Sequence, residues 1–184
     1  ICARLGTTFD AEIFESEAGP RGTALVREHE GTIFSVSQGA VVYDETRSGL
    51  HTRVFLNSEG LPTYEAKDLG NFALKHERFP AWTHSIVVTG GEQAEYFKVV
   101  YAAIQEVFPV AKERVLEHIP TGFLTLTTGK MSSRKGNVLT GESLLDALES
   151  AARERAALTR TDDIDRLATQ VAVAALKYQI LRQA

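Results

Sequence analysis

The residues best suited to chemistry stand in one short polar run, Gly129-Lys130-Met131-Ser132-Ser133-Arg134-Lys135-Gly136-Asn137. Its glycines allow the backbone to move, and its lysine and arginine side chains can stabilise negative charge on a bound group. A basic surface loop that water simply solvates is the alternative interpretation. A methionine enclosed by a lysine and two serines is hard to explain by solvation, so the run favours a binding loop.

A tyrosine and an aspartate form a second candidate pair. Tyr64 and Asp68 are four positions apart in the run Pro62-Thr63-Tyr64-Glu65-Ala66-Lys67-Asp68-Leu69. Thr63 is a suitable N-cap for a helix that ends near Arg78, and helical residues four apart share one face. The two side chains are therefore expected to lie together. An exposed aspartate beside a half-buried tyrosine is the alternative.

Two glycines follow a predicted strand. The β-branched run 85–89 indicates a buried parallel strand, and Gly90-Gly91-Glu92-Gln93 comes directly after it. Ligands of open α/β sheets lie outside the carboxyl ends of strands. Paired glycines there permit close approach, and a helix start offers free N–H groups. Because turns in many proteins need glycine, the pair alone is a weak indication.

Together these three runs resemble the class I aminoacyl-tRNA synthetases. The run 129–137 is similar to their Lys-Met-Ser-Lys-Ser loop, including the glycine and asparagine after it. The run 62–68 resembles the pattern of arginyl-tRNA synthetases, which is Pro-Thr-Tyr, three residues, then Asp. The resemblance covers about residues 6–181. It implies an α/β fold: the second half of a Rossmann-like (class I synthetase) nucleotide-binding domain with a parallel sheet, followed by α-helices that lead to a missing helical domain.

The resemblance implies an arginine–tRNA ligase, with arginine and tRNA(Arg) as partners. In this family the tyrosine and the aspartate line the arginine pocket, and Gln93 matches a position that faces the amino acid. Tyr64, Asp68 and Gln93 are therefore expected to bind arginine. A planar guanidinium is best bound by a carboxylate aligned with its fork, and an aromatic ring can pack on its face. Lysine would satisfy such a pocket poorly.

The resemblance also implies ATP, with Mg²⁺, as the activating substrate. Amino-acid activation builds negative charge on the phosphates, so catalysis is mainly positioning and electrostatic stabilisation. Lys130 matches the first lysine of the family's loop, whereas Ser133 stands at the second, and Arg134 or Lys135 is expected to replace that lysine. The residues expected to contact ATP are Gly90, Gly91, Glu92, Lys130, Met131, Ser132 and Ser133.

The helices and strands predicted from the rest of the sequence must position these residues. It predicts an extended segment over 6–17 that Gly19-Pro20 breaks, helices over 21–30, 63–78, 92–108, 142–155 and 162–182, and strands over 39–45, 53–57, 85–89, 115–119 and 123–126. Strands that alternate with helices predict an α/β sheet with crossover connections. Residues 1–140 are expected to form the second half of the catalytic domain, and residues 141–184 a helical junction toward an anticodon-binding domain.

Composition narrows the class of protein. The net charge of -4 and the pI of about 5.8 argue against a chain that binds nucleic acid by itself. One cysteine, Cys2, provides neither a disulfide framework nor a thiolate metal site, so we expect no metal ligands and a reducing cytoplasm. No apolar run reaches the ~18 residues that cross a bilayer. We expect a monomer.

One signature of the family is absent, because no His-Ile-Gly-His tetrapeptide occurs. The chain also begins at Ile1 and not at methionine, so we expect an excised fragment that is inactive alone. Two alternatives stay open. A class I lysyl-tRNA synthetase would also have an acidic pocket, whereas a cysteinyl enzyme would need zinc ligands that one cysteine cannot supply. A non-catalytic paralogue or binding module would explain Ser133 in place of lysine.

Overall fold

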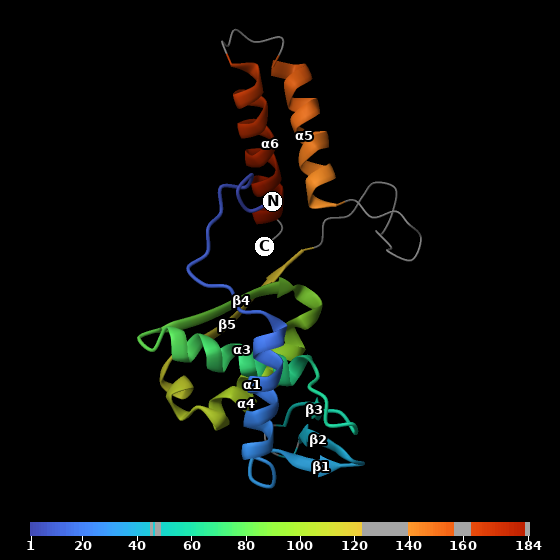
Figure 1. Ribbon diagram of the computed structural model, residues 1–184, viewed down its shortest axis with the longest axis vertical. Coiled ribbons are helices and arrows are strands. Elements are labelled where there is room, and N and C mark those ends of the chain that lie inside the picture. Colours follow the sequence, from blue (N-terminus) through green and yellow to red (C-terminus); the bar gives the residue numbers. More distant parts are fainter. Residues whose placement is uncertain (45, 47–48, 123–139, 157–162, 183–184) are drawn as a thin grey trace. The chain divides into compact units, whose positions relative to one another are not determined.

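The computed structural model of the 184-residue chain describes residues 1–44, 46, 49–122, 140–156 and 163–182 (Figure 1). These residues form two compact units, one of Ala11–Pro120 and one of Ile1–Asp10 with Thr121–Ala184. The loop 129–137 and the predicted strand 123–126 lie outside the described residues. The expected division into 1–140 and 141–184 stays a prediction.

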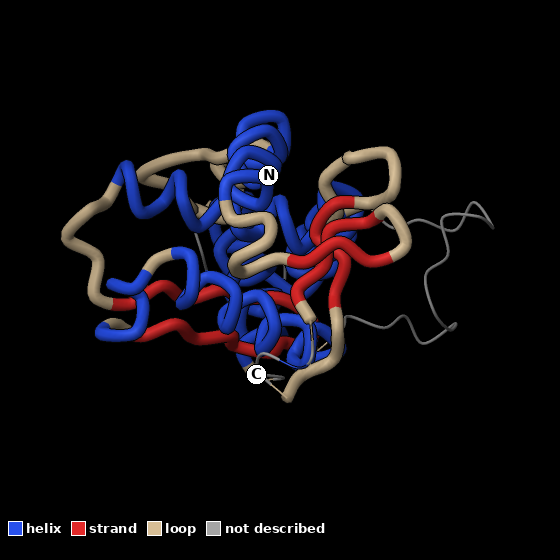
Figure 2. Tube along the Cα trace, turned by 90° about the horizontal axis from the view of Figure 1, so that it is seen from below, coloured by secondary structure: helices blue, strands red, loops and turns tan. Residues whose placement is uncertain are grey.

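The larger unit combines helices with two small groups of strands, drawn in red in Figure 2. Its elements are α1 (Glu15–Glu28), β1 (Ser35–Ser37), β2 (Ala40–Tyr43), β3 (Arg53–Leu56), α3 (Tyr64–Arg78), β4 (His84–Gly90), η1 (Gly91–Gln93), α4 (Ala94–Val107), η2 (Pro109–Glu113) and β5 (Val115–Thr121). Strands β1, β2 and β3 form an antiparallel sheet in that order. Strands β4 and β5 form a parallel pair, and α4 lies in the crossover between them.

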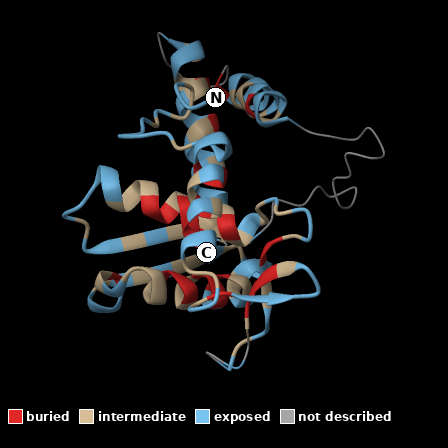
Figure 3. Ribbon diagram, turned by 60° about the horizontal axis from the view of Figure 1, so that its bottom comes forward, coloured by how far each residue is buried: buried red, intermediate tan, exposed pale blue. Residues whose placement is uncertain are grey.

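The core of this unit joins the antiparallel sheet to helices α3 and α4 (Figure 3). Phe34, Tyr43 and Phe55 are buried, and the rings of Phe34 and Phe55 lie 4.9 Å apart between centroids. The helices contribute buried side chains to the same core, among them Leu69, Phe72, Phe97, Val100 and Ile104. Because the interior is close-packed, β3, α3 and α4 are fixed relative to one another. These three elements, together with η1, bear the residues that line the cleft described below.

Helix α1 packs directly on the backbone of α3 through two glycines. A Cβ atom on Gly22 would lie 1.8 Å from the Ala66 carbonyl oxygen, and one on Gly70 would lie 2.0 Å from the Ala18 carbonyl oxygen. Only glycine permits this approach at either position. Asp68 is two residues before Gly70, which is about 200° around the helix. Helix α1 therefore packs against the face of α3 that contains Gly70, and Asp68 lies on the opposite face of α3.

The prediction for the first helix was wrong at its start. Gly19-Pro20 was expected to end an extended segment, yet α1 begins at Glu15 and continues through Pro20. Glycine and proline both disfavour a helix interior locally. The contact between α1 and α3 outweighs that preference, because Ala18, Gly19 and Gly22 are all buried. Residues 35–37 were also not predicted as a strand, although they pair with β2.

Strand β4 was expected to be buried on both faces, and this is also wrong. Its burial alternates along the strand: Ser85, Val87 and Thr89 are half-buried, whereas Ile86 is 47% exposed and Val88 is 59% exposed. Alternation is the pattern of a strand that packs on one face. The described residues of the larger unit therefore cover one face of the parallel pair.

The smaller unit contains α5 (Gly141–Ala156) and α6 (Ile164–Leu181), which lie side by side (Figure 1). Thr140 caps α5, since its Oγ1 accepts from the Ser143 amide at 3.1 Å. Helix α6 is capped by Asp163, which accepts from the Arg166 amide at 2.9 Å. Across the described residues, no helix is both long and apolar enough to span a membrane.

Candidate functional site

A cleft of about 320 Å³ lies in the larger unit where β3, the start of α3, η1 and the start of α4 meet. The residues that line it are Arg53, Tyr64, Glu65, Asp68, Glu92, Gln93 and Tyr96. Tyr64, Asp68 and Gln93, which were predicted to bind arginine, thus share one cleft. Glu92, predicted to contact ATP, lines it too.

Helix α3 presents Tyr64 and Asp68 one turn apart, as their spacing predicts. The Tyr64 side chain is open to solvent, with 69% exposure, and Lys67 Nζ lies 5.0 Å from its ring centroid. Thr63 precedes the helix, but its side chain does not cap it. Thr63 Oγ1 instead donates to the Val54 carbonyl oxygen at 2.6 Å, which attaches the start of α3 to strand β3.

Asp68 lies deeper in the cleft and is held by a neighbouring helix. The Tyr96 hydroxyl donates to Asp68 Oδ2 at 2.5 Å. Burial raises the pKa of Asp68 above its ordinary value, while the Tyr96 hydrogen bond and the positive charge of Lys75 act against that rise. Burial also raises the pKa of Tyr96, and the adjacent Asp68 carboxylate adds to the effect. Tyr96 therefore stays a protonated donor.

The cleft is acidic, because three carboxylates line it with one guanidinium. That guanidinium, on Arg53, pairs with Glu65 at 3.4 Å and lies 5.5 Å from the centroid of the Tyr96 ring. The Glu65 side chain is only 12% exposed. None of the ion pairs among the described residues includes Asp68 or Glu92, although the positive charge of Lys75 acts on Asp68. A positively charged ligand therefore suits this cleft.

The carboxyl ends of β4 and β5 meet beside the cleft. Gly90 ends β4 with φ -61° and ψ 146°, an ordinary extended conformation, and Gly91 begins η1. Glycine at position 90 is thus not required by a left-handed backbone. Thr89 Oγ1 and His118 Nε2 lie 2.8 Å apart and link the end of β4 to the middle of β5. The His118 ring stacks on Phe97 at 4.7 Å between centroids.

Three lining residues were not predicted, namely Arg53, Glu65 and Tyr96. Tyr96 is three positions after Gln93 at the start of a predicted helix, and residues three apart lie on one face, so its place could have been inferred. No local pattern indicates Arg53, because only the folding of β3 against α3 brings it here. The loop residues Lys130, Met131, Ser132, Ser133, Arg134 and Lys135 lie outside the described residues.

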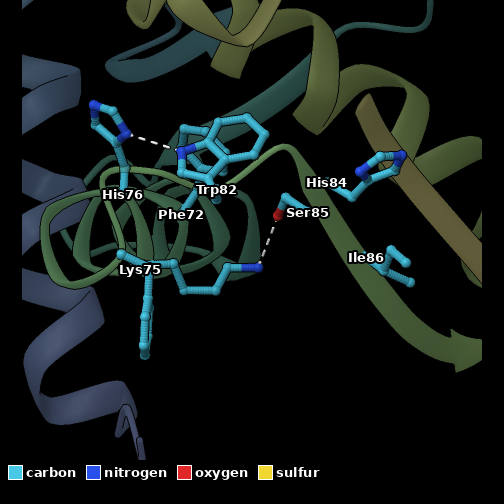
Figure 4. Close-up of a pocket in the computed structure, with 8 residues that line it drawn as sticks. Phe72, Lys75, His76, Trp82, His84, Ser85 and Ile86 are labelled. Carbon is cyan, nitrogen blue, oxygen red and sulfur yellow. Dashed lines mark hydrogen bonds between the residues drawn. The ribbon is translucent and has the colours of Figure 1, made fainter. Parts of the chain in front are cut away.

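A second cavity, of about 240 Å³, lies at the other end of α3, next to the start of β4 (Figure 4). Its polar groups bind one another: Lys75 Nζ donates to Ser85 Oγ at 3.0 Å, and Trp82 Nε1 donates to His76 Nδ1 at 3.0 Å. Because ligands of such sheets lie at the carboxyl ends of strands, we assign the site to the first cleft. Nowhere in the described part of the chain do three or more His, Cys, Asp or Glu side chains gather as a metal site would require.

Comparison with known proteins identifies the fold as that of a class I tRNA synthetase. Residues 12–184 match the family model described as "tRNA synthetases class I (R), catalytic domain". The chain therefore belongs to the class I tRNA synthetases, in the family of arginyl-tRNA synthetases. The predicted family and fold class are confirmed.

Similar proteins with curated names support the same family assignment. The arginine–tRNA ligase of Treponema pallidum is 31% identical over 186 residues, which cover 97% of this chain and 31% of that protein. The arginine–tRNA ligase of Borreliella afzelii is also 31% identical, over 97% of this chain and 32% of its own length. The chain thus spans about a third of the length of these relatives.

Solved structures show the same fold. The arginyl-tRNA synthetase of Plasmodium falciparum matches with a TM-score of 0.76 and 18% identity, over 99% of this chain and 31% of that one. The arginyl-tRNA synthetase of Thermus thermophilus matches with a TM-score of 0.72 and 20% identity, over 97% of this chain and 37% of that one.

Proposed function

We propose that this chain is part of an arginine–tRNA ligase, in which the cleft binds arginine for activation by ATP and transfer to tRNA(Arg). The observation that supports this most directly is the acidic cleft around Asp68, found in a chain of the arginyl-tRNA synthetase family. Among its carboxylates, Glu65 is already paired with Arg53. Asp68 and Glu92 are the carboxylates that an incoming cation would meet.

In this proposal each predicted residue has a distinct task. The Asp68 carboxylate accepts hydrogen bonds from the arginine guanidinium, a planar group that matches a carboxylate in two parallel bonds. Tyr64, exposed at the mouth of the cleft, packs against the side chain of the bound arginine. Gln93, at the end of η1, contacts the amino-acid end of the substrate. Partial burial of the site strengthens each of these electrostatic contacts.

The adjoining strand end supports the position of ATP. Gly90 and Gly91 place no side chain at the carboxyl end of β4, where η1 and then α4 begin. The arginine carboxylate attacks the α-phosphorus of ATP, and pyrophosphate leaves. Lys130, with Arg134 or Lys135, would stabilise the charge on the phosphates. Mg²⁺ is usually bound through substrate phosphates rather than in a cage of protein ligands, so the described residues need not supply one.

The test is ATP–pyrophosphate exchange by the full-length protein that contains this chain, in the presence of tRNA(Arg). Arginine, lysine and cysteine are compared in parallel. Exchange with arginine alone is expected, and Asp68→Asn should then reduce kcat/KM for arginine by about 100-fold or more, since it leaves a desolvated cation without its charged partner. Glu95→Gln is the matched control, because Glu95 is an exposed carboxylate of α4 that pairs with Lys98.

The other outcomes distinguish the alternatives. Exchange with lysine alone would make the protein a lysyl-tRNA synthetase. No exchange with any amino acid would favour a non-catalytic paralogue, for which Ser133 in place of the family's second lysine is the supporting observation.

A further inference from the structure

One hydrogen bond joins the two helices that line the cleft. The Tyr96 hydroxyl of α4 donates to Asp68 Oδ2 of α3 at 2.5 Å. The last torsion of an aspartate side chain is broad and two-fold, so a free carboxylate turns easily. A donor on a second, packed helix removes this freedom before any ligand arrives. Ligand binding then no longer has to order the carboxylate, which improves affinity.

Tyr96 is itself held by its neighbours. Its ring meets the Phe97 ring edge-on, with centroids 5.0 Å apart and planes at 90°. The Arg53 guanidinium lies 5.5 Å from the Tyr96 ring centroid and pairs with Glu65 at 3.4 Å. The resident cation is thus placed on the Tyr96 ring and on Glu65. Arg53 therefore does not pair with Asp68. The positive charge of Lys75 acts on that carboxylate without an ion pair, so its oxygens can still accept from a ligand cation.

We propose that Tyr96 is a specificity-determining positioning residue, which holds Asp68 in one orientation and so favours a guanidinium over an ammonium group. The inference rests on the proposed function. A guanidinium donates two parallel hydrogen bonds and needs the carboxylate in the plane of its fork. An ammonium is a compact point charge that tolerates many carboxylate orientations. Loss of the Tyr96 hydroxyl should therefore weaken arginine binding more than lysine binding.

The test is Tyr96→Phe in the full-length protein, assayed by ATP–pyrophosphate exchange with tRNA(Arg) present. A hydrogen bond to a charged group contributes enough binding free energy that its loss should raise KM for arginine about tenfold. The value of kcat should change much less. The inhibition constant of lysine, measured as a competitor of arginine, should change less than KM for arginine.

A pH profile provides a readout that a purely structural role would not move. The Tyr96 hydrogen bond lowers the pKa of Asp68, so its removal raises that pKa. The acid limb of kcat/KM for arginine should therefore move to higher pH in Tyr96→Phe. The other charged groups that act on Asp68 or share its cleft are Lys75 and Glu65 of α3, Glu15 of α1, Arg53 of β3 and Glu92 of η1. Tyr101 of α4 is near enough that Asp68 raises its pKa. All of these groups are unchanged in Tyr96→Phe.

Tyr101→Phe is the matched control. Tyr101 is on the same helix and also contacts Phe97, but its hydroxyl donates to the Glu117 carbonyl oxygen at 2.8 Å. Its removal should leave KM for arginine unchanged, and thermal unfolding of both variants checks that each is folded. In an Asp68→Asn background, Tyr96→Phe should have little further effect, because the two residues act through one contact.

Two results would overturn the inference: a KM for arginine in Tyr96→Phe equal to that in Tyr101→Phe, or a full tenfold effect in the Asp68→Asn background. Absence of arginine exchange by the unmodified protein would instead overturn the proposed function.

Discussion

At the scale of single residues, the proposed function depends most on Asp68, which lines the cleft. The spacing of Tyr64 and Asp68 in the sequence predicted that they share a helix face, and both line the cleft. Arg53 could not be predicted in this way, because a contact between β3 and α4 depends on the tertiary fold. Local spacing therefore found the residues that one helix presents. It did not find the ion pair between Arg53 and Glu65, which balances part of the negative charge of the cleft.

Burial of Asp68 leads to a prediction about stability. Its pKa is raised in the folded chain, so ionisation is less favourable there than in the unfolded chain, and stability falls as pH rises through the folded pKa. Asp68→Asn removes that charge. The variant should unfold at a higher temperature than the unmodified protein near pH 7, while losing activity with arginine.

The same linkage sets the pH window of the effect. The difference in unfolding temperature should disappear at pH values below the ordinary range of aspartate, about 3.9, where the carboxyl group is protonated in both states. Thermal unfolding of both proteins from pH 3 to 8 measures it. If Asp68→Asn were less stable than the unmodified protein across the whole pH range, the surroundings of Asp68 would stabilise its ionised form, which contradicts the prediction.

At the scale of elements, the site depends on how α3 is held. The predicted helix 63–78 agrees with α3 (Tyr64–Arg78), because its amphipathic spacing is a local signal, although the Thr63 side chain does not form the expected cap. Helix α1 was misjudged, since Gly19-Pro20 disfavours a helix locally and only the packing against α3 explains its course. The burial of β4 was misjudged for a related reason: a continuous apolar run does not tell whether one face or two are covered.

The glycine contact between α1 and α3 predicts a large effect of one methyl group. Gly22→Ala places a Cβ where the Ala66 carbonyl oxygen lies, and it should destabilise the chain by about 3 kcal/mol or more. Gly19→Ala on the same helix is the control, because its Cβ would meet only Pro62 Cγ, at 3.7 Å. That variant should be neutral or slightly more stable. Chemical denaturation of both variants measures the difference, and equal stability would contradict the close contact.

At the scale of the whole molecule, the chain corresponds to about a third of its curated relatives. Resemblance to a family predicted its class and fold from a few short runs, and the family match confirms both.

The absent His-Ile-Gly-His tetrapeptide yields a prediction about the chain alone. The isolated 184 residues should give no ATP–pyrophosphate exchange with arginine, even with tRNA(Arg), because the second signature of the resembling family does not occur in the sequence. The full-length protein under the same conditions is the control. Robust exchange by the isolated chain would show that the described cleft and the loop 129–137 suffice for activation.

The surroundings of Trp82 have a practical use. It is the one tryptophan of the 184 residues, and it donates to His76, meets the Phe72 ring edge-on at 5.4 Å and lies 4.8 Å from the Arg114 guanidinium. Those partners come from α3 and from the residue before β5, so any loosening between them changes the environment of a single indole. The chain therefore contains its own fluorescent reporter for the larger unit, and its emission would follow unfolding of that unit without a label.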